Sequence, residues 1–301
     1  MMNKFFDNQY FKNLNRRDFL KLSAFSLLGA ALTGVGINYA TNIEPSDVEV
    51  TNINLILPRL DKSFDGFKLA QISDLHLDNW MTSDRIKAIF QLVLAQKPDL
   101  VAITGDFITF HKNTQGLKNP YLTDLASALN TLSSKQPTLA VLGNHDHEIG
   151  APLIRDALAA GHVTDLSNSI YSINQGPSSL HFAGMDCMDF VNNGRYDFKG
   201  LANRTPSDGA AIILVHYPDL ANQSARTGRF DLQISGHSHG GQVIIPFGGP
   251  IYVPDGARRY PIGLYRVGSM LHYTNRGLGM CGIQMRINCR PEITIYHLQS
   301  G

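Results

Sequence analysis

The stretch LAVLGNHD at residues 139–146 joins a short apolar run to the polar block Gly143-Asn144-His145-Asp146. Four more apolar runs, at residues 69–73, 100–104, 212–215 and 232–235, each precede a similar block. Those blocks are Asp74-Leu75-His76, Gly105-Asp106, His216 and Gly236-His237-Ser238-His239. Apolar runs of this length are typical of buried strands, and residues just past the carboxyl ends of neighbouring strands build the sites of open α/β sheets. The sequence therefore predicts an α/β fold with one shared polar site.

The residue types in these blocks indicate a metal centre. Neutral imidazole and carboxylate suit first-row transition metals such as manganese, iron and zinc. No cysteine lies in any block, which argues against a structural thiolate zinc site. Two divalent ions about 3.5–4 Å apart need one ligand that bridges them, and a carboxylate has two oxygens for this role. We therefore expect two divalent metal ions, with Asp106 as the natural bridge.

The order Asp-x-His, Gly-Asp, Gly-Asn-His-Asp, His, Gly-His-x-His resembles that of the calcineurin-like metallophosphoesterases, over residues 67–298. The resemblance implies a four-layer α-β-β-α sandwich of two mixed sheets with flanking helices. It also implies two sets of metal ligands: Asp74, His76 and His239 for the first ion, Asn144, His216 and His237 for the second, with Asp106 between them. His145 would face the substrate, as a general acid or as a stabiliser of transition-state charge.

Two longer motifs narrow the resemblance. GHSHGGQV at residues 236–243 precedes Pro246-Phe247, and Arg276-Gly277-Leu278-Gly279 precedes Pro291-Glu292. Together they resemble the bacterial exported phosphodiesterases of this family, a branch that also contains enzymes similar to UDP-2,3-diacylglucosamine pyrophosphatases.

Each block taken alone has a simpler interpretation, because Asp-x-His and Gly-Asp are common and Asn and Asp favour turns. The five blocks in family order outweigh that interpretation. His147 and His272 are further candidates for the pocket lining. The other histidines, which are His111, His162, His181 and His297, are interpreted as surface or packing residues.

Composition excludes some classes of protein. The chain has 301 residues, a net charge of +1 and no long basic run. It therefore lacks the clustered positive charge that is typical of specific nucleic-acid binding. Six arginines lie in a stretch without Asp or Glu: Arg258, Arg259, Arg266, Arg276, Arg286 and Arg290. We expect them either to contact an anionic substrate or membrane surface or to serve as structural residues. The three cysteines, Cys187, Cys281 and Cys289, have no metal or redox spacing, so no essential disulfide is expected.

The amino-terminal segment predicts export. Arg16-Arg17 with Phe19-Leu20-Lys21 precedes an apolar run at residues 22–37 and resembles a twin-arginine signal, which the twin-arginine export machinery would recognise. The run falls short of the roughly 18 residues of a transmembrane helix, but no Ala-x-Ala cleavage site follows it. We expect residues 1–40 to be a signal or a membrane anchor, 41–47 a linker, and 48–301 one domain facing the periplasm or the cell wall.

The spacing of apolar residues predicts the remaining strands and helices of the domain. Strands are predicted at residues 48–57, 163–165, 169–173, 180–184, 241–245, 271–274 and 293–298. Helices are predicted from a Ser83 cap to a point before Pro98, over 122–132, and from Pro152 towards Ala160, whereas 107–121 and 187–206 are expected to be irregular. Phe247, Ile251 and Tyr252 are candidates for an apolar rim beside the site.

These observations predict a metal-dependent phosphodiesterase, in which a hydroxide bridging the two metals attacks phosphorus. A phosphodiester or pyrophosphate of the cell envelope, small or lipid-linked, is the expected substrate. A UDP-2,3-diacylglucosamine pyrophosphatase-type hydrolase is the main alternative, and a non-catalytic scaffold of the same fold is a remote one. No substrate-binding residue follows from the sequence.

Overall fold

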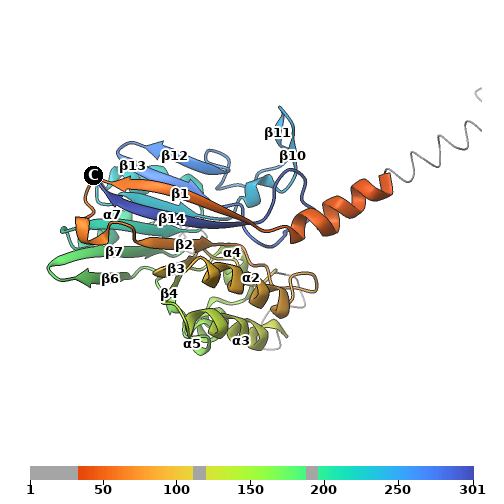
Figure 1. Cartoon of the computed structure of the whole chain (residues 1–301), viewed down its shortest axis with the longest axis horizontal. Coiled ribbons are helices and arrows are strands. Elements are labelled where there is room, and N and C mark those ends of the chain that lie inside the picture. Colours follow the sequence, from red (N-terminus) through yellow and green to blue (C-terminus); the bar gives the residue numbers. More distant parts are fainter. Residues whose placement is uncertain (1–32, 111–119, 188–195) are drawn as a thin grey trace, which may run out of the picture.

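The computed structural model describes residues 33–110, 120–187 and 196–301. Two six-stranded sheets and a small two-stranded hairpin form the β structure (Figure 1). Both large sheets are mixed, as predicted. The hairpin consists of β10 (Ile244–Ile245) and β11 (Gly249–Pro250) and projects from the body of the molecule.

The first sheet carries three of the five polar blocks. Its order is β1 (Glu49–Leu57), β14 (Glu292–Ser300), β2 (Lys68–Ile72), β3 (Leu100–Ile103), β4 (Thr138–Ala140) and β5 (Thr164–Asp165). β2 to β5 run parallel, so the blocks after β2, β3 and β4 emerge at the same edge. All four residues of β3 are buried, as expected of a strand covered on both faces.

The second sheet carries the other two blocks. Its order is β12 (Gly263–Val267), β13 (Met270–Thr274), β9 (Leu232–Ser235), β8 (Ala210–Val215), β7 (Ser178–Met185) and β6 (Ile170–Gln175). β13, β9, β8 and β7 run parallel, and β8 is buried throughout. The polar blocks after β8 and β9 therefore also emerge at one edge.

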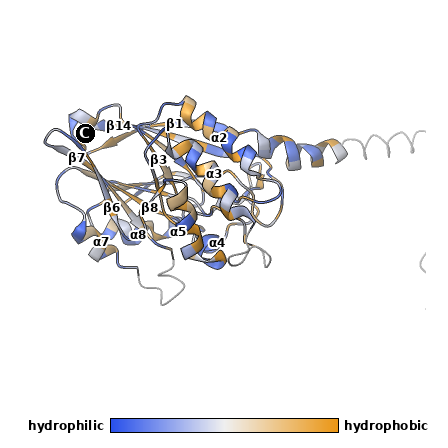
Figure 2. Ribbon diagram, turned by 90° about the horizontal axis from the view of Figure 1, so that it is seen from below, coloured by the Kyte–Doolittle hydropathy of each residue, from blue (hydrophilic) through white to orange (hydrophobic). Residues whose placement is uncertain are grey.

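Helices cover the outer faces of both sheets. The longer ones are α2 (Ser83–Ala95), α3 (Tyr121–Ser133) and α5 (Ala151–Ala160) on the first sheet, and α7 (Phe198–Arg204) and α8 (Ala221–Arg226) on the second. Figure 2 shows α2 and α3 on one side of the strands and α7 and α8 on the other. The predicted four-layer α-β-β-α sandwich is confirmed.

Successive side chains along a strand point to opposite faces of the sheet and pack into two different hydrophobic cores. Leu69 of β2 belongs to the core between the two sheets, whereas Ala70 and Ile72 face the helices. On α2, Ile86 and Phe90 are fully buried against that outer face. This packing fixes the strand ends, and therefore the loops that carry the polar blocks.

The structure corrects three details of the sequence-based prediction. Thr82 caps α2 in place of Ser83, because the Thr82 hydroxyl oxygen accepts the Arg85 N–H at 3.4 Å. Within 187–206, residues Phe198–Arg204 form α7 behind an Asp197 cap. Strand β12 escaped prediction because it is an edge strand with alternating exposure and no continuous apolar run.

The segment that leads into the domain is helical. Residues 33–38 form a helix that continues into turns at Tyr39–Ile43 and Glu44–Ser46. Glu44 is buried and accepts the Cys289 N–H at 2.6 Å, so the expected linker at 41–47 packs on the domain. Within the described ranges, no helix has the length and apolar character needed to cross a membrane. Arg16 and Arg17 lie outside these ranges.

Candidate metal centre

Loops from both sheets meet at one buried polar centre. The first sheet contributes the blocks that follow β2, β3 and β4, and the second contributes those that follow β8 and β9. The blocks therefore converge across the space between two facing sheets, and not along a single sheet.

Three of the expected ligands form a first cluster. Donor atoms of Asp74, His76 and His239 all lie within 4.8 Å of one another, and all three residues are buried. The Nε2 atoms of His76 and His239 are 3.1 Å apart, and His239 Nε2 lies 3.4 Å from Asp74 Oδ1.

A second cluster adjoins the first. Donor atoms of Asp106, His216 and His237 lie within 4.8 Å of one another. His216 Nε2 is 3.3 Å from Asp106 Oδ2 and 3.2 Å from Asn144 Oδ1. The same Asp106 oxygen lies 3.6 Å from His76 Nε2, so one carboxylate stands between the two clusters.

Hydrogen bonds fix which imidazole nitrogen faces the centre. A carbonyl oxygen only accepts, so His216 Nδ1 donates to Thr104 O at 2.7 Å and its Nε2 faces Asp106. In the same way His237 Nε2 donates to Asp255 O at 2.9 Å, which leaves Nδ1 as its donor atom to a metal. A histidine that binds a metal through one ring nitrogen usually donates a hydrogen bond from the other, which fixes its tautomer and orientation.

Protonation states fit a cation at this position. Burial and the neighbouring histidines hold the pKa of both His76 and His237 at about 3, so both rings are neutral ligands. Burial lowers the His216 pKa, but Asp106 beside it raises the value to about 9. Positive charge is therefore favoured between His216 and Asp106, whether a proton or a metal ion supplies it. His76 Nδ1 and His239 Nδ1 are buried without a hydrogen-bond partner.

The ligand loops use an unusual backbone conformation. Five residues have positive φ: Asp74 (51°), His76 (49°), Asp106 (57°), His237 (67°) and His239 (51°). Non-glycine residues adopt this region at a cost, and such strain gathers at functional sites. Gly143 is required beside them, because a Cβ there would lie 2.1 Å from Asp106 Oδ1.

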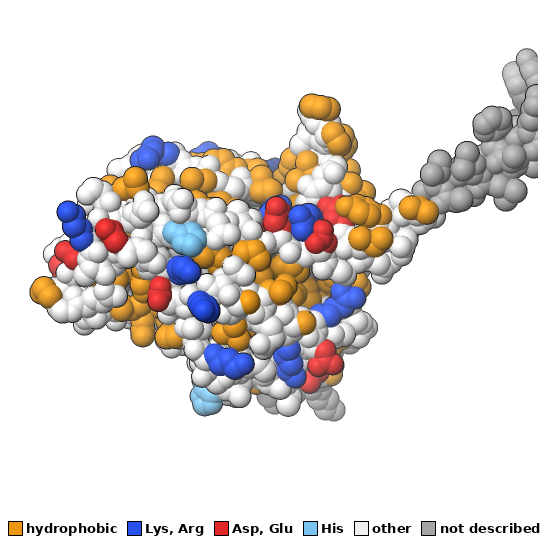
Figure 3. Space-filling view, viewed as in Figure 1, with side chains coloured by type: hydrophobic (Ala, Val, Ile, Leu, Met, Phe, Trp, Pro, Cys, Tyr) orange, Lys and Arg blue, Asp and Glu red, His pale blue; other side chains and the backbone are white. Residues whose placement is uncertain are grey.

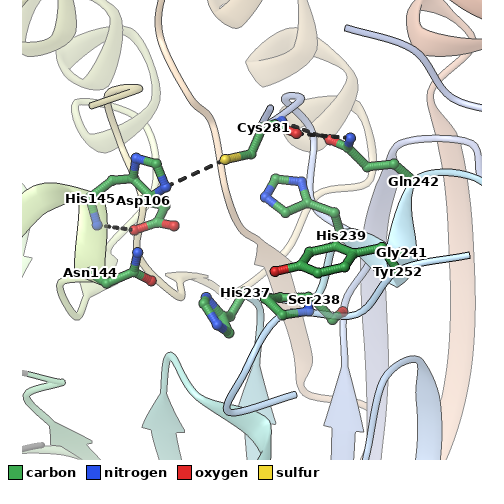
Figure 4. Close-up of a pocket in the computed structure, with 11 residues that line it drawn as sticks. Asp106, Asn144, His145, His237, Ser238, His239, Gly241, Gln242, Tyr252 and Cys281 are labelled. Carbon is green, nitrogen blue, oxygen red and sulfur yellow. Dashed lines mark hydrogen bonds between the residues drawn. The ribbon is translucent and has the colours of Figure 1, made fainter. Parts of the chain in front are cut away.

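His145 faces the cavity next to the two clusters (Figure 4). Its Nδ1 accepts the Phe110 N–H at 3.0 Å, and its Nε2 lies 3.4 Å from Cys281 Sγ. Burial lowers the His145 pKa, but Asp106 outweighs it and raises the pKa to about 10. The Phe110 bond opposes that charge, because a backbone N–H needs the lone pair that only the neutral ring has free on Nδ1.

The cavity itself has a volume of about 250 Å³. Besides the expected site residues, its lining includes Gln242, Tyr252 and Cys281. Cys281 has no role in the sequence-based prediction, since cysteine spacing carries no information about a single thiol in a pocket. Of the three residues predicted to form an apolar rim, Tyr252 lines the cavity, whereas Phe247 and Ile251 do not.

Asp146 is a further site residue that the sequence left without a role. Its carboxylate accepts three backbone N–H groups, those of Gly143 at 2.8 Å and of Asp106 and Phe107 at 2.9 Å each. Burial and the nearby Asp106 raise its pKa to about 7. Asp146 thus ties the Gly-Asp loop to the Gly-Asn-His-Asp loop.

Neither His147 nor His272 lines the cavity, contrary to prediction. His147 Nε2 lies 2.6 Å from Asp186 Oδ1, and His272 is buried beside the rings of Tyr260 and Tyr265. Their partners therefore lie outside the two ligand clusters.

Several of the clustered arginines have structural partners. Arg276 pairs with Glu292 and Glu49, and Arg290 pairs with Asp47. Arg286 is fully buried and donates to the carbonyl oxygens of Gly277 and Gly279. Arg286 holds the Arg-Gly-Leu-Gly loop through these bonds, and none of the three arginines lines the cavity.

Comparison with known proteins agrees with this geometry. Residues 67–241 match the family model described as calcineurin-like phosphoesterase. The chain is 35% identical, over 96% of its length, to the uncharacterized metallophosphoesterase YkuE of Bacillus subtilis (strain 168), of which it covers 99%. It is 28% identical, over 95% of its length, to phosphodiesterase YaeI of Escherichia coli (strain K12), again covering 99%. Among solved structures, the NAD nucleotidase of Haemophilus influenzae gives a TM-score of 0.47 at 14% identity, over 70% of this chain and 45% of that longer one.

Proposed function

Because this chain belongs to the calcineurin-like phosphoesterase family of metal-dependent phosphoester hydrolases, we propose that it is a phosphodiesterase with a centre of two divalent metal ions. The observation that carries this proposal is the pair of adjoining donor clusters that share one carboxylate, that of Asp106. A single ion would need neither the second cluster nor a ligand placed between them.

The positions of the donor atoms support the ligand sets that the family resemblance implies. In our proposal, Asp74, His76 and His239 hold one ion, whereas Asn144, His216 and His237 hold the other. Asp106 binds both. Manganese, iron or zinc fits these nitrogen and oxygen donors.

Bound divalent ions would lower the pKa of water and polarise phosphoryl oxygens. His145 then acts on the substrate from the cavity side. A cation beside Asp106 would offset the carboxylate that favours a charged imidazole, so the Phe110 bond to Nδ1 keeps the ring neutral. The Nε2–H then donates a hydrogen bond to a phosphoryl oxygen as negative charge develops, which favours charge stabilisation over general-acid catalysis.

The substrate in this proposal is a phosphodiester of the cell envelope. The similarity to a phosphodiesterase over nearly the whole chain supports the reaction class. The main alternative is a pyrophosphatase acting on UDP-2,3-diacylglucosamine, and the uncharged lining residues Gln242 and Tyr252 suit such an amphiphilic molecule. We also propose export by the twin-arginine route, from the arginine pair at residues 16–17.

Metal analysis combined with turnover tests the proposal. Purified protein loaded with manganese, iron or zinc should bind two ions and hydrolyse bis-p-nitrophenyl phosphate. Asp106→Asn should retain fewer than two ions and lose hydrolysis, whereas Asp156→Asn on the exposed face of α5 should match the wild type. Two bound ions without hydrolysis of any phosphodiester, including UDP-diacylglucosamine, would instead support the non-catalytic scaffold.

A further inference from the structure

Three uncharged segments contain most of the exposed large apolar side chains among the described residues. Residues 33–43, 240–254 and 277–285 contain no Asp, Glu, Lys or Arg. Among the described residues, these segments hold nine of the twelve large apolar side chains that are exposed. We call this group the apolar face. Its amino-terminal members are Val35, Ile37, Tyr39 and Ile43, its hairpin members are Ile245, Phe247, Ile251 and Tyr252, and Ile283 completes it.

Backbone hydrogen bonds hold the three segments side by side. Arg286 N donates to Ala40 O at 2.8 Å, which joins the amino-terminal turn to the loop after residue 280. Ile244 N donates to Ile287 O at 2.9 Å, which joins that loop to the hairpin. In Figure 1 the hairpin and the amino-terminal helix project from the same end of the molecule, and in Figure 3 hydrophobic side chains mark the hairpin tip and the base of the helix.

Phe247 occupies the hairpin tip in a costly conformation. Its side chain is fully exposed and its φ is +64°, a region that bulky residues rarely adopt. Gly248 N closes the turn on Ile245 O at 3.0 Å, so the ring is held away from the body. An exposed aromatic ring on a strained turn gains nothing within this chain, and an external apolar phase would stabilise it.

We propose that the apolar face docks on a phospholipid bilayer, with the hairpin tip inserted among the lipid headgroups and upper acyl chains. Convexity favours a bilayer over a protein partner, because the hairpin and the helix protrude from the body of the molecule. Aliphatic and aromatic side chains without charges suit the membrane interface. The sequence agrees, since the uncharged apolar run at residues 22–37 is continuous along the chain with the amino-terminal members of this face, which begin at Val35.

Docking would also place the cavity at the membrane surface. Gly241, Gln242 and Tyr252 of the hairpin segment and Cys281 of the neighbouring loop line the cavity. The catalytic centre would therefore meet phosphodiester or pyrophosphate groups at the level of lipid headgroups. This last step, which assigns a lipid-linked substrate, rests on the proposed function, whereas the docking itself does not.

Tryptophan fluorescence of the full-length chain tests the docking. Phe247→Trp places a reporter at the tip, and Ile56→Trp is the matched control, a 59% exposed apolar site on β1 at the opposite end of the molecule. Vesicles of phosphatidylethanolamine and phosphatidylglycerol with brominated acyl chains quench only inserted indoles. We expect strong quenching and a blue shift for residue 247 and neither for residue 56, after subtraction of the Trp80 signal of the wild type.

A second pair of variants tests the role of the apolar tip. In an Ile251→Trp background, Phe247→Asp should raise the lipid concentration for half-maximal quenching about tenfold or more, because one large apolar side chain no longer leaves water. Vesicle binding without quenching at residue 247 would overturn the proposal, since the amino-terminal run alone would then anchor the chain. A blue shift that depends on protein concentration and needs no vesicles would also overturn it, in favour of self-association.

Activity on two substrates distinguishes the proposals on membrane docking and lipid-linked substrate from the proposed function. Phe247→Asp should slow hydrolysis of UDP-diacylglucosamine presented in vesicles about tenfold and leave bis-p-nitrophenyl phosphate hydrolysis unchanged, because Phe247 lies outside the cavity lining. Equal effects on both substrates would refute the lipid-linked substrate. Quenching at residue 247 in a protein that hydrolyses neither substrate would refute the proposed function and leave the docking intact.

Discussion

At the scale of single residues, the candidate site depends on backbone conformation as much as on side-chain type. Asp74 and Asp106 both have positive φ, and their loops are held by hydrogen bonds between chain segments. Asp74 N donates to Gly105 O at 2.9 Å, and His76 N donates to Asp106 O at 3.0 Å. These bonds offset the local strain and fix the ligand loops before any ion binds.

The role of His145 leads to the first prediction. His145→Ala should keep both metal ions and lose about 10²–10³-fold in turnover, the usual loss for one donor that stabilises transition-state charge. The loss should be the same for a p-nitrophenyl and for an alkyl leaving group, because the Nε2–H of the proposed neutral ring can donate a hydrogen bond but is too weak an acid to protonate a leaving group. The test measures the metal content of the variant and its turnover number for each of the two substrates.

His162→Ala, at an exposed position after α5, is the control and should behave like the wild type. A much larger loss for the alkyl leaving group would identify His145 as a general acid. Loss of a metal ion from the His145 variant would instead make it a ligand.

At the scale of elements, glycines let the ligand loops approach one another. Gly105, Gly143 and Gly236 each lie so close to a neighbouring loop that a Cβ would come within 2.6 Å of another atom. The sequence displays these glycines inside the polar blocks, but only the packed loops give the reason for them.

Gly143→Ala is therefore predicted to disrupt the centre. The new methyl group would overlap Asp106 Oδ1 at 2.1 Å and displace the carboxylate between the two clusters. Overpacking of this kind costs about 1–3 kcal/mol, so the variant should unfold at a lower temperature and bind metal at least about tenfold more weakly. Thermal melts and metal titrations provide the measurement.

Gly36→Ala is the matched substitution, since a Cβ there meets no atom within 4 Å. It should leave melting temperature and metal affinity unchanged. Wild-type metal affinity in Gly143→Ala would show that the Asp106 carboxylate is not constrained by its neighbour.

At the scale of the whole molecule, the second sheet contains a buried titratable group. Burial lowers the pKa of His272 to about 3, below the value of 6.5 for the free side chain. The neutral ring therefore stabilises the fold fully above pH 6.5, and this contribution is lost as the pH falls from 6.5 towards 3.

His272→Phe should reduce that acid sensitivity. Between about pH 6 and pH 4 the wild type should lose about 1.4 kcal/mol more per pH unit than the variant, since unfolding releases one ring to take up a proton. Urea unfolding at several pH values measures the difference, and the metal-site histidines cancel because both proteins contain them. Parallel pH dependences would rule out a buried neutral His272.

The arginine pair at residues 16–17 leads to a prediction about export of the whole protein. Arg16→Lys with Arg17→Lys keeps the positive charge but removes the guanidinium pair that a twin-arginine receptor would recognise. The enzyme should then accumulate, folded and active, on the cytoplasmic side of the membrane. Fractionation with an activity assay measures this, and wild-type levels on the outer face would mark the segment as an ordinary signal or anchor.

The sequence by itself determined the α/β class, the strands that carry the site and the residue types of the metal centre. Each is a local property: buried strands appear as apolar runs, and ligands follow them directly along the chain. Helices α3 and α5 were predictable for the same reason, because their apolar positions recur with the helical period. Edge strand β12 and helix α7 lack such a signal.

Only the tertiary structure decided how the blocks combine. His216 Nδ1 reaches Thr104 O across 112 residues of sequence, and that bond joins the two sheets at the centre. The Phe110 bond to His145 Nδ1, the Cys281 thiol in the cavity and the contiguous apolar face also depend on segments far apart in the chain. Such contacts follow from the packing of one sheet on another, and periodicity within a segment carries no information about which distant segment it will meet.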